Sequence, residues 1–103
     1  MQSTGISERH IEAEYQSKID ILQRIIGQME AATADLRGYV KAEEARTKIV
    51  DARSPAYSIF AKAARERADK LCASIRHLRS ELEIARGQKL GVTDVLRSAP
   101  YDF

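Results

Sequence analysis

The sequence is dominated by an apolar repeat that runs on both sides of a single Ser54-Pro55 step. Its apolar residues recur at alternating spacings of three and four residues, which aligns them along one stripe of an under-wound helix, as in a coiled coil. Proline breaks a helix interior but is accepted in the first turn, particularly after a serine that can cap the free N–H groups. Ser54-Pro55 therefore predicts the start of a second helix. We expect an all-α fold of two long helices in an antiparallel coiled-coil hairpin, with its tip near Arg53-Pro55.

The stripe of core positions is called the seam below. Before the break its members are Tyr15, Ile19, Leu22, Ile26, Met29, Thr33, Leu36, Val40, Glu43, Thr47 and Val50, and after the break they are Tyr57, Ala61, Ala64, Ala68, Leu71, Ile75, Leu78, Leu82, Ala85, Lys89 and Val92. The first helix is expected from about Ser7 to Ala52. A single helical-hairpin domain is expected over residues 1–103, with loose ends at about 1–6 and 98–103, where the repeat is missing.

A second architecture also keeps the seam intact. The repeat continues in step through the break, so a continuous kinked helix in a parallel dimer would preserve it. In the antiparallel hairpin, however, residues whose numbers sum to about 107–109 face each other. This register places Glu44 opposite Arg65 and Glu30 opposite Arg79, which are complementary pairs. Because a proline inside a continuous helix is also costly, the hairpin is favoured.

Composition agrees with a thin helical protein. The 103 residues allow one domain, and 31% charged residues with 6% aromatic residues suit exposed helices better than a thick core. The lone Cys72 cannot form an internal disulfide and indicates a reducing compartment. The N-terminus lacks the apolar segment of a signal peptide, and no apolar run is long enough to cross a bilayer. A cytoplasmic location without membrane insertion is therefore expected.

The sequence contains no recognisable catalytic, phosphate-binding or metal-binding motif. His10 and His77 are far apart in the predicted hairpin, and each is expected to be a solvated helix residue. Glu43 and Glu44 are adjacent carboxylates, but neighbouring residues point to different faces of a helix. We therefore expect no enzyme activity, no cofactor and no metal.

Charge and exposed apolar residues favour a protein partner over a nucleic acid. Residues from Ala56 onward carry nine Lys/Arg against six Asp/Glu, and residues up to Pro55 carry eight against nine. This mild asymmetry is typical of two helices held in register by complementary charge, whereas nucleic-acid binding needs a concentrated basic stripe. Several apolar residues lie off the seam and predict a partner surface, namely Ile21, Ile25, Tyr39, Ile49, Ile59, Phe60 and Ile84.

A strip of residues around the break carries a resemblance to a known family. The strip comprises Glu43, Glu44, Arg46, Thr47, Ile49 and Asp51, followed by Ala56, Tyr57, Phe60, Ala61, Lys62, Ala63, Ala64 and Arg67. It resembles the tip region of FliJ-type flagellar type III export proteins, particularly alphaproteobacterial ones. The similarity extends over roughly residues 15 to 90, although its coiled-coil part is unspecific. Three departures are the replacement of the family's basic opening by residues 7–12, a shorter C-terminal helix, and the position of Pro55, a few residues earlier than in the family.

The resemblance implies a non-enzymatic, cytoplasmic component of the flagellar export apparatus, similar to the central stalk of rotary ATPases. Such a stalk binds and stimulates the hexameric export ATPase and contacts the cytoplasmic domain of the export gate or export chaperones, at the inner-membrane side of the flagellar base. It serves flagellum biogenesis, protein export and hence motility and chemotaxis. Partner contacts are then expected at Tyr39, Ile49, Tyr57 and Phe60, of which Tyr57 is also a seam residue. The alternatives are a generic coiled-coil adaptor or export chaperone, or a homodimeric tether unrelated to flagella.

Overall fold

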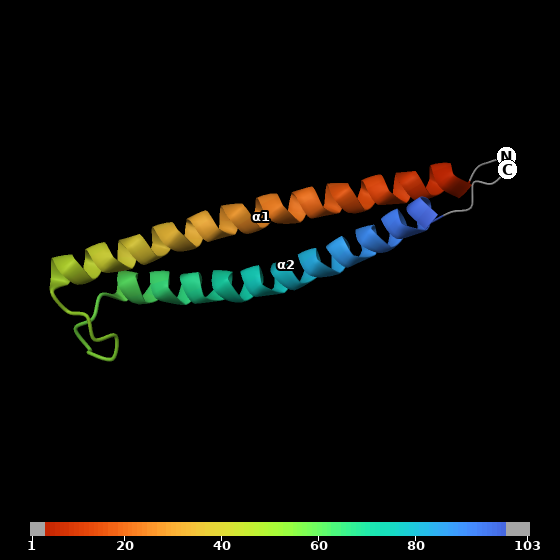
Figure 1. Cartoon of the computed structure of the whole chain (residues 1–103). Helices are drawn as coiled ribbons and strands as arrows, with labels where there is room; N and C mark the ends of the chain where they lie inside the picture. Colours follow the sequence, from red (N-terminus) through yellow and green to blue (C-terminus); the bar gives the residue numbers. More distant parts are fainter. Residues whose placement is uncertain (1–3, 99–103) are drawn as a thin grey trace. The chain divides into compact units, whose positions relative to one another are not determined.

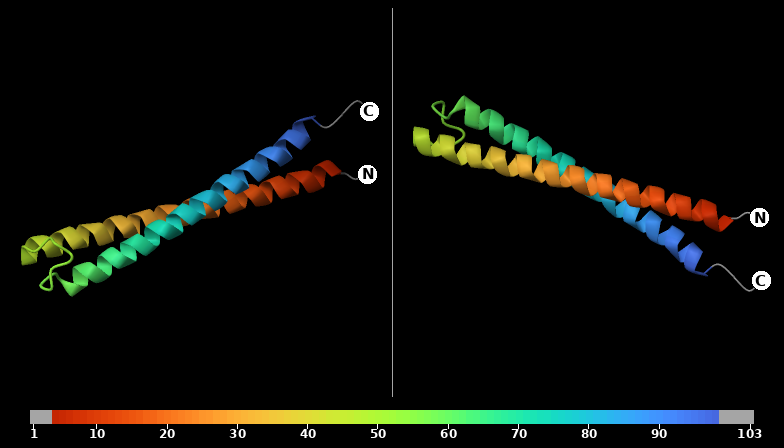
Figure 2. Two further views of the ribbon diagram at one scale, coloured as in Figure 1. Left: turned by 90° about the horizontal axis from the view of Figure 1, so that it is seen from below. Right: turned by 90° about the horizontal axis from the view of Figure 1, so that it is seen from above.

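The protein is described by a computed structural model, which covers residues 4–98 and consists of two long antiparallel helices (Figure 1). Helix α1 spans Thr4–Thr47 and helix α2 spans Ile59–Ser98. Residues 48–58 form the connection, which joins the two neighbouring helix ends in both further views (Figure 2). The predicted hairpin is confirmed, and its tip includes Arg53-Pro55 as expected.

The contacts divide the chain into two units, each built from one segment of either helix. The terminal unit comprises the described residues 4–25 and 78–98, and the tip unit comprises Ile26–His77. In the terminal unit, Ile19 and Leu22 of α1 are buried together with Leu82 and Ala85 of α2. The buried residues of the tip unit are Ile26, Thr33, Val40, Glu43, Tyr57, Ala61, Ala64, Ala68 and Ile75.

All these buried residues are members of the predicted seam, so the heptad pattern identified the core of both units correctly. The α2 side of the seam is rich in alanine, and Ala61, Ala68 and Ala85 are completely inaccessible to solvent. Small side chains on one helix leave room for the isoleucine, leucine and valine side chains of the other. Val50 is the exception among the predicted seam residues, because it lies in the connection and is 70% exposed.

The predicted helix boundaries were wrong at the tip. Helix α1 ends at Thr47 rather than at about Ala52, and α2 begins at Ile59 rather than at Pro55. Ser54 does not cap a helix. Its hydroxyl accepts a hydrogen bond from the N–H of Ala56 at 3.2 Å, and its carbonyl accepts one from the N–H of Tyr57 at 3.0 Å, so it closes a local turn.

Helix α1 begins at Thr4 and Ser98 is the last residue of α2, so residues 4–6 and 98 of the expected loose ends belong to helices, and their looseness stays a prediction. The remainder of those predicted ends, residues 1–3 and 99–103, lies outside the described residues. Neither α1 nor α2, within residues 4–98, contains a stretch that is apolar and long enough to span a membrane.

Candidate functional site

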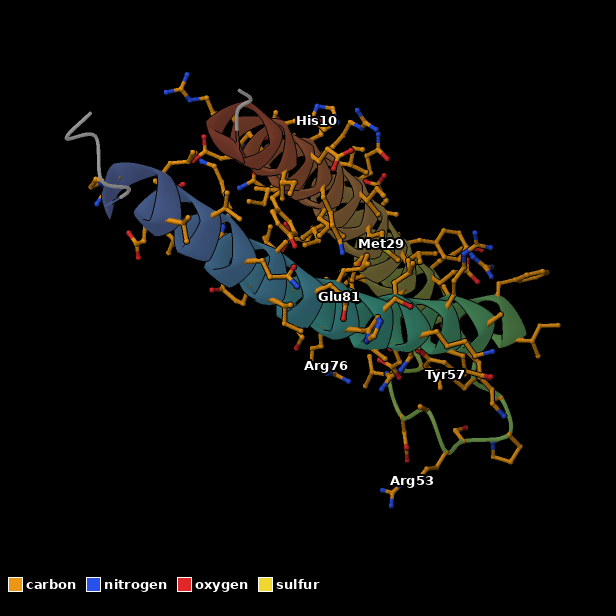
Figure 3. The ribbon with its side chains drawn as sticks, turned by 90° about the vertical axis from the view of Figure 1, so that its right-hand side faces the viewer. His10, Met29, Arg53, Tyr57, Arg76 and Glu81 are labelled. Carbon is orange, nitrogen blue, oxygen red and sulfur yellow. The ribbon has the colours of Figure 1, made fainter. Side chains whose placement is uncertain are left out.

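The connection at the tip is held by a series of local hydrogen bonds. Lys48 terminates α1 in the left-handed backbone region, with a φ of 59°, while its N–H donates to the carbonyl of Glu44 at 2.7 Å. This conformation is a common helix terminus, usually occupied by glycine. In the middle of the connection, Asp51 Oδ1 accepts the N–H of Arg53 at 3.0 Å, and Figure 3 shows Arg53 projecting away from the helices. These bonds give the tip a defined path despite its lack of regular structure.

Ser58 is the residue that caps α2. Its side-chain hydroxyl oxygen accepts a hydrogen bond from the N–H of Ala61 at 3.2 Å, and its carbonyl accepts one from the N–H of Lys62 at 3.0 Å. Serine is among the best N-cap residues because it satisfies one of the free N–H groups of the first turn. The sequence offered two serines for this position, and Ser58 was missed because the proline after Ser54 was a stronger local signal.

A buried carboxylate connects this cap to α1. Glu43 occupies a seam position and is only 8% exposed. Its two oxygens accept hydrogen bonds from Arg46, at 2.7 Å and 3.1 Å, and Oε2 also accepts the hydroxyl of Ser58 at 2.5 Å. These hydrogen bonds, chiefly the one with Arg46, lower the pKa of Glu43 to about 2. The ionised Glu43 therefore ties the end of α1 to the start of α2.

Glu44 makes a second, separate link across the tip. The Tyr57 hydroxyl donates to Glu44 Oε2 at 2.6 Å, and Arg65 Nη1 lies 3.6 Å from the same oxygen. The hydrogen bond to Glu44 raises the pKa of Tyr57, and burial acts in the same direction. The predicted facing of Glu44 and Arg65 is confirmed, while the facing of Glu30 and Arg79 stays a prediction. Because Glu43 and Glu44 have different partners, they form no carboxylate pair suited to acid–base chemistry.

A third contact across the helices in the tip unit involves Arg37. Its Nη2 lies 3.8 Å from Asp69 Oδ1 and donates to the Sγ of Cys72 at 3.3 Å. Cys72 is half-buried and forms no disulfide within the described residues. The Arg37 contacts and the Glu44–Arg65 contact lie on the same flank of the hairpin, because all five residues immediately follow a seam position.

The opposite flank of the tip unit carries exposed aromatic side chains. In an antiparallel coiled coil, residues that immediately precede seam positions share the other flank, and Tyr39, Arg46, Phe60 and Arg67 all do so. Tyr39 is 46% exposed and Phe60 is 62% exposed. We call these four residues the aromatic flank. It combines two large apolar side chains with two guanidinium groups, which are residue types that concentrate binding energy at protein interfaces.

The four predicted partner residues therefore have different environments. Tyr39 and Phe60 are exposed as expected. Tyr57 is buried, and in Figure 3 it lies where the connection returns to the helices, so its role in the tip is structural. Ile49 was expected at an outer position, and this is wrong: it is half-buried and packs against the cluster of Val40, Tyr57, Ala61 and Ala64, because the connection folds back over the seam.

Two further exposed features lie at the tip, and the first of them is Ile59, one of the off-seam apolar residues singled out from the sequence. Ile59, the first residue of α2, is 74% exposed. It borders a shallow depression on the outer face of α2 that is lined by Ile59, Lys62, Ala63, Glu66, Arg67 and Lys70. Basic residues at about one-turn spacing on a helix that also carries Ile59 are a signal that is visible in the sequence. The tip unit thus presents apolar and basic groups together.

The polar side chains of the tip described above are hydrogen-bonded to one another. Within residues 4–98, no cluster of three or more His, Cys, Asp or Glu side chains has the arrangement of a metal site. His10 lies on the exposed surface of α1, 3.3 Å from Glu14. No family model, curated protein or solved structure matches this chain.

Proposed function

We propose that this protein is a non-enzymatic coiled-coil stalk of the flagellar type III export apparatus, which binds and stimulates the export ATPase ring and contacts the export gate or export chaperones. The observation that carries the proposal is the aromatic flank at the tip of a hairpin. Phe60 and Tyr39 are exposed there, whereas the seam positions next to them are buried. The two aromatic side chains therefore lie where a partner can contact them and not where the core would bury them. Exposed aromatic residues beside guanidinium groups are typical anchors of a protein interface.

The residues that carry the family resemblance have a common role in the tip. Glu43, Glu44, Arg46 and Tyr57 form the side-chain links that hold the connection in place. The strip therefore contains the residues that hold this tip together. A protein that builds a similar tip is expected to use it for a similar purpose. Phe60 and Arg67 are members of the same strip that make no such link, and they are available to a partner.

Truncation of the aromatic flank tests the proposal. Phe60→Ala and Tyr39→Ala should leave the helix content unchanged, because both side chains are largely outside the seam. Each should weaken capture of the purified export ATPase or of the soluble gate domain, and loss of an interface anchor commonly costs about 1–4 kcal/mol of binding. Ile21→Ala is a matched control, since Ile21 is 45% exposed, as Tyr39 is, but belongs to the terminal unit.

The assay is a pull-down with the two purified components, accompanied by a motility assay of strains that carry each variant. Ile49→Ala is unsuitable as a binding test, because its side chain supports the core of the tip. Equal capture by wild type, Phe60→Ala and Tyr39→Ala would remove the aromatic flank from the interface. Failure of the wild-type chain to bind either component would refute the stalk and favour the generic adaptor or export chaperone.

A further inference from the structure

The outer face of α2 at the tip combines apolar and basic side chains around one depression. We call its six lining residues the basic face: Ile59, Lys62, Ala63, Glu66, Arg67 and Lys70. Counted from Ile59, the others follow after three, four, seven, eight and eleven residues, which is the spacing of one helix face. The buried seam residues of α2 in this stretch, Ala61, Ala64 and Ala68, occupy the other side of the helix. The basic face therefore takes no part in the core of the hairpin.

The charges of the basic face are not balanced within the chain. On the flanks of the tip unit, cations are paired with carboxylates along or between the helices. The basic face instead carries the three cations of Lys62, Arg67 and Lys70 against the single carboxylate of Glu66. None of these four side chains forms an ion pair with another residue of the described range 4–98. The surface therefore has a net positive charge that favours an anionic partner.

Ile59 distinguishes this surface from an ordinary solvated row of charges. It is 74% exposed, the highest value among the large apolar side chains of the described residues. It is the first residue of α2, where Ser58 already supplies the cap, and neither capping nor helix propensity favours an isoleucine there. Ala63 follows one turn later, and its small side chain leaves room beside Ile59. An apolar side chain of a partner can therefore pack against these two residues.

We propose that the basic face binds an acidic amphipathic helix of a partner protein. The apolar side chains of that helix pack on Ile59 and Ala63, and its carboxylates face Lys62, Arg67 and Lys70. A helix fits because the face runs straight along α2 for about 16 Å, from Ile59 to Lys70. An extended peptide would need a sheet edge for its backbone, whereas the backbone of α2 is already hydrogen-bonded within the helix. The inference does not depend on which protein carries the partner helix, so it stands or falls separately from the export stalk.

Other anionic partners match this surface less well. A nucleic acid is held by many phosphate contacts along a concentrated basic stripe, and three cations arranged around Glu66 and Ile59 do not form one. A helix that lies on an anionic membrane buries large apolar side chains over several turns. On the basic face, Ala63 and Glu66 follow Ile59, so the apolar contact is confined to one end. A single apolar anchor with carboxylates beyond it is the complement that this pattern selects.

Fluorescence anisotropy with a labelled synthetic peptide tests the proposal on the full chain. The probe is an alanine-based helical peptide of about 20 residues, with two leucines one turn apart and three glutamates on the same face. It should bind wild type with a dissociation constant below about 1 mM at low ionic strength, and added salt should weaken the binding. A peptide with glutamine in place of each glutamate should bind about tenfold more weakly or worse.

Charge reversal locates the binding on the basic face. Lys62→Glu/Lys70→Glu should raise the dissociation constant by about tenfold or more, and a probe with lysine in place of glutamate should bind this variant better than it binds wild type. Lys41→Glu/Arg76→Glu is the matched control, because both residues are exposed in the tip unit and the net charge changes equally. Ile59→Ser should raise the dissociation constant by about fivefold and leave the salt dependence unchanged.

Two results with unaltered protein would overturn the proposal: no binding of the acidic peptide by wild type, or equal binding of the glutamine peptide. An equal loss in Lys41→Glu/Arg76→Glu and in Lys62→Glu/Lys70→Glu would show that overall charge, and not this face, attracts the peptide. Duplex DNA and vesicles that contain phosphatidylglycerol are run in parallel. Tighter binding of either one, abolished by Lys62→Glu/Lys70→Glu, would assign the face to that partner instead. Circular dichroism checks that each variant keeps the helix content of wild type.

Discussion

Two isoleucines on the same helix, two residues apart, provide a direct test of the seam. Ile19 is 5% exposed and Ile21 is 45% exposed, although both lie in α1 and within the terminal unit. Ile19→Ala removes a nearly fully buried side chain, and such truncations usually cost about 2–5 kcal/mol. The lower part of this range, about 2–3 kcal/mol, is expected here, because Ile19 borders a shallow surface depression with Gln16, Gln23 and Leu90 that allows neighbours to relax.

Ile21→Ala is the matched control. Its side chain already meets solvent over nearly half of its surface, so the substitution loses little burial. Alanine also has a higher helix propensity than isoleucine, which offsets part of the loss. The expected change in the free energy of unfolding is within about 0.5 kcal/mol of zero.

Urea unfolding followed by far-ultraviolet circular dichroism measures both values on the full chain. The same slope with denaturant is required in all three proteins, since a changed slope indicates a different unfolded or native state. If the two variants differed by less than about 0.5 kcal/mol, or if Ile21→Ala were the more destabilising, the α1 stripe that faces α2 would be misassigned.

Three further predictions concern the tip. Lys48→Gly should raise the free energy of unfolding by about 0.5–1 kcal/mol in urea unfolding, because glycine adopts the φ of 59° without strain; a loss would show that Lys48 is not held in that conformation. Glu43 has a folded pKa of about 2 against an ordinary 4.5, so its ionised form stabilises the fold fully above about pH 5, and this contribution is lost as the pH falls from 4.5 to 2. The thermal unfolding temperature of wild type should fall more steeply over that pH interval than that of Glu43→Gln. Equal falls in the two proteins would contradict the assignment. Glu44→Arg should destabilise the tip, and Arg65→Glu in the same chain should recover part of the loss; no recovery in the double-mutant cycle would mean that the two charges do not interact.

The core of this protein follows from its sequence because a coiled coil is a repetitive structure. The position of a residue in the heptad determines which side of the helix it occupies, and no knowledge of distant residues is needed. Ile19, Leu22, Ala68 and Leu82 were therefore assigned to the core from spacing alone, and all are buried. The antiparallel direction also followed from the sequence, since a proline disfavours a continuous helix and the charges of Glu44 and Arg65 match only in the hairpin.

The candidate site was predicted in part for the same reason. Tyr39 and Phe60 lie in regular helix, beside seam positions, so their exposure could be deduced from their spacing. Ile49 could not be assigned in this way, because it follows the end of α1 and its environment depends on how the connection folds back. Its packing against Val40 and Tyr57 exists only once both helices are in place.

The tip was decided by the tertiary structure. Ser54-Pro55 has the local features of a helix start, and a helix that began there would keep the heptad in step. Ser58 nevertheless caps α2, because its hydroxyl reaches Glu43, fifteen residues earlier, while the Tyr57 hydroxyl reaches Glu44, thirteen residues earlier. These bonds join the two helices to each other, so they have no counterpart in either helix alone. Local preference selects among possible caps, but a buried carboxylate that must be satisfied by hydrogen bonds determines which serine is used.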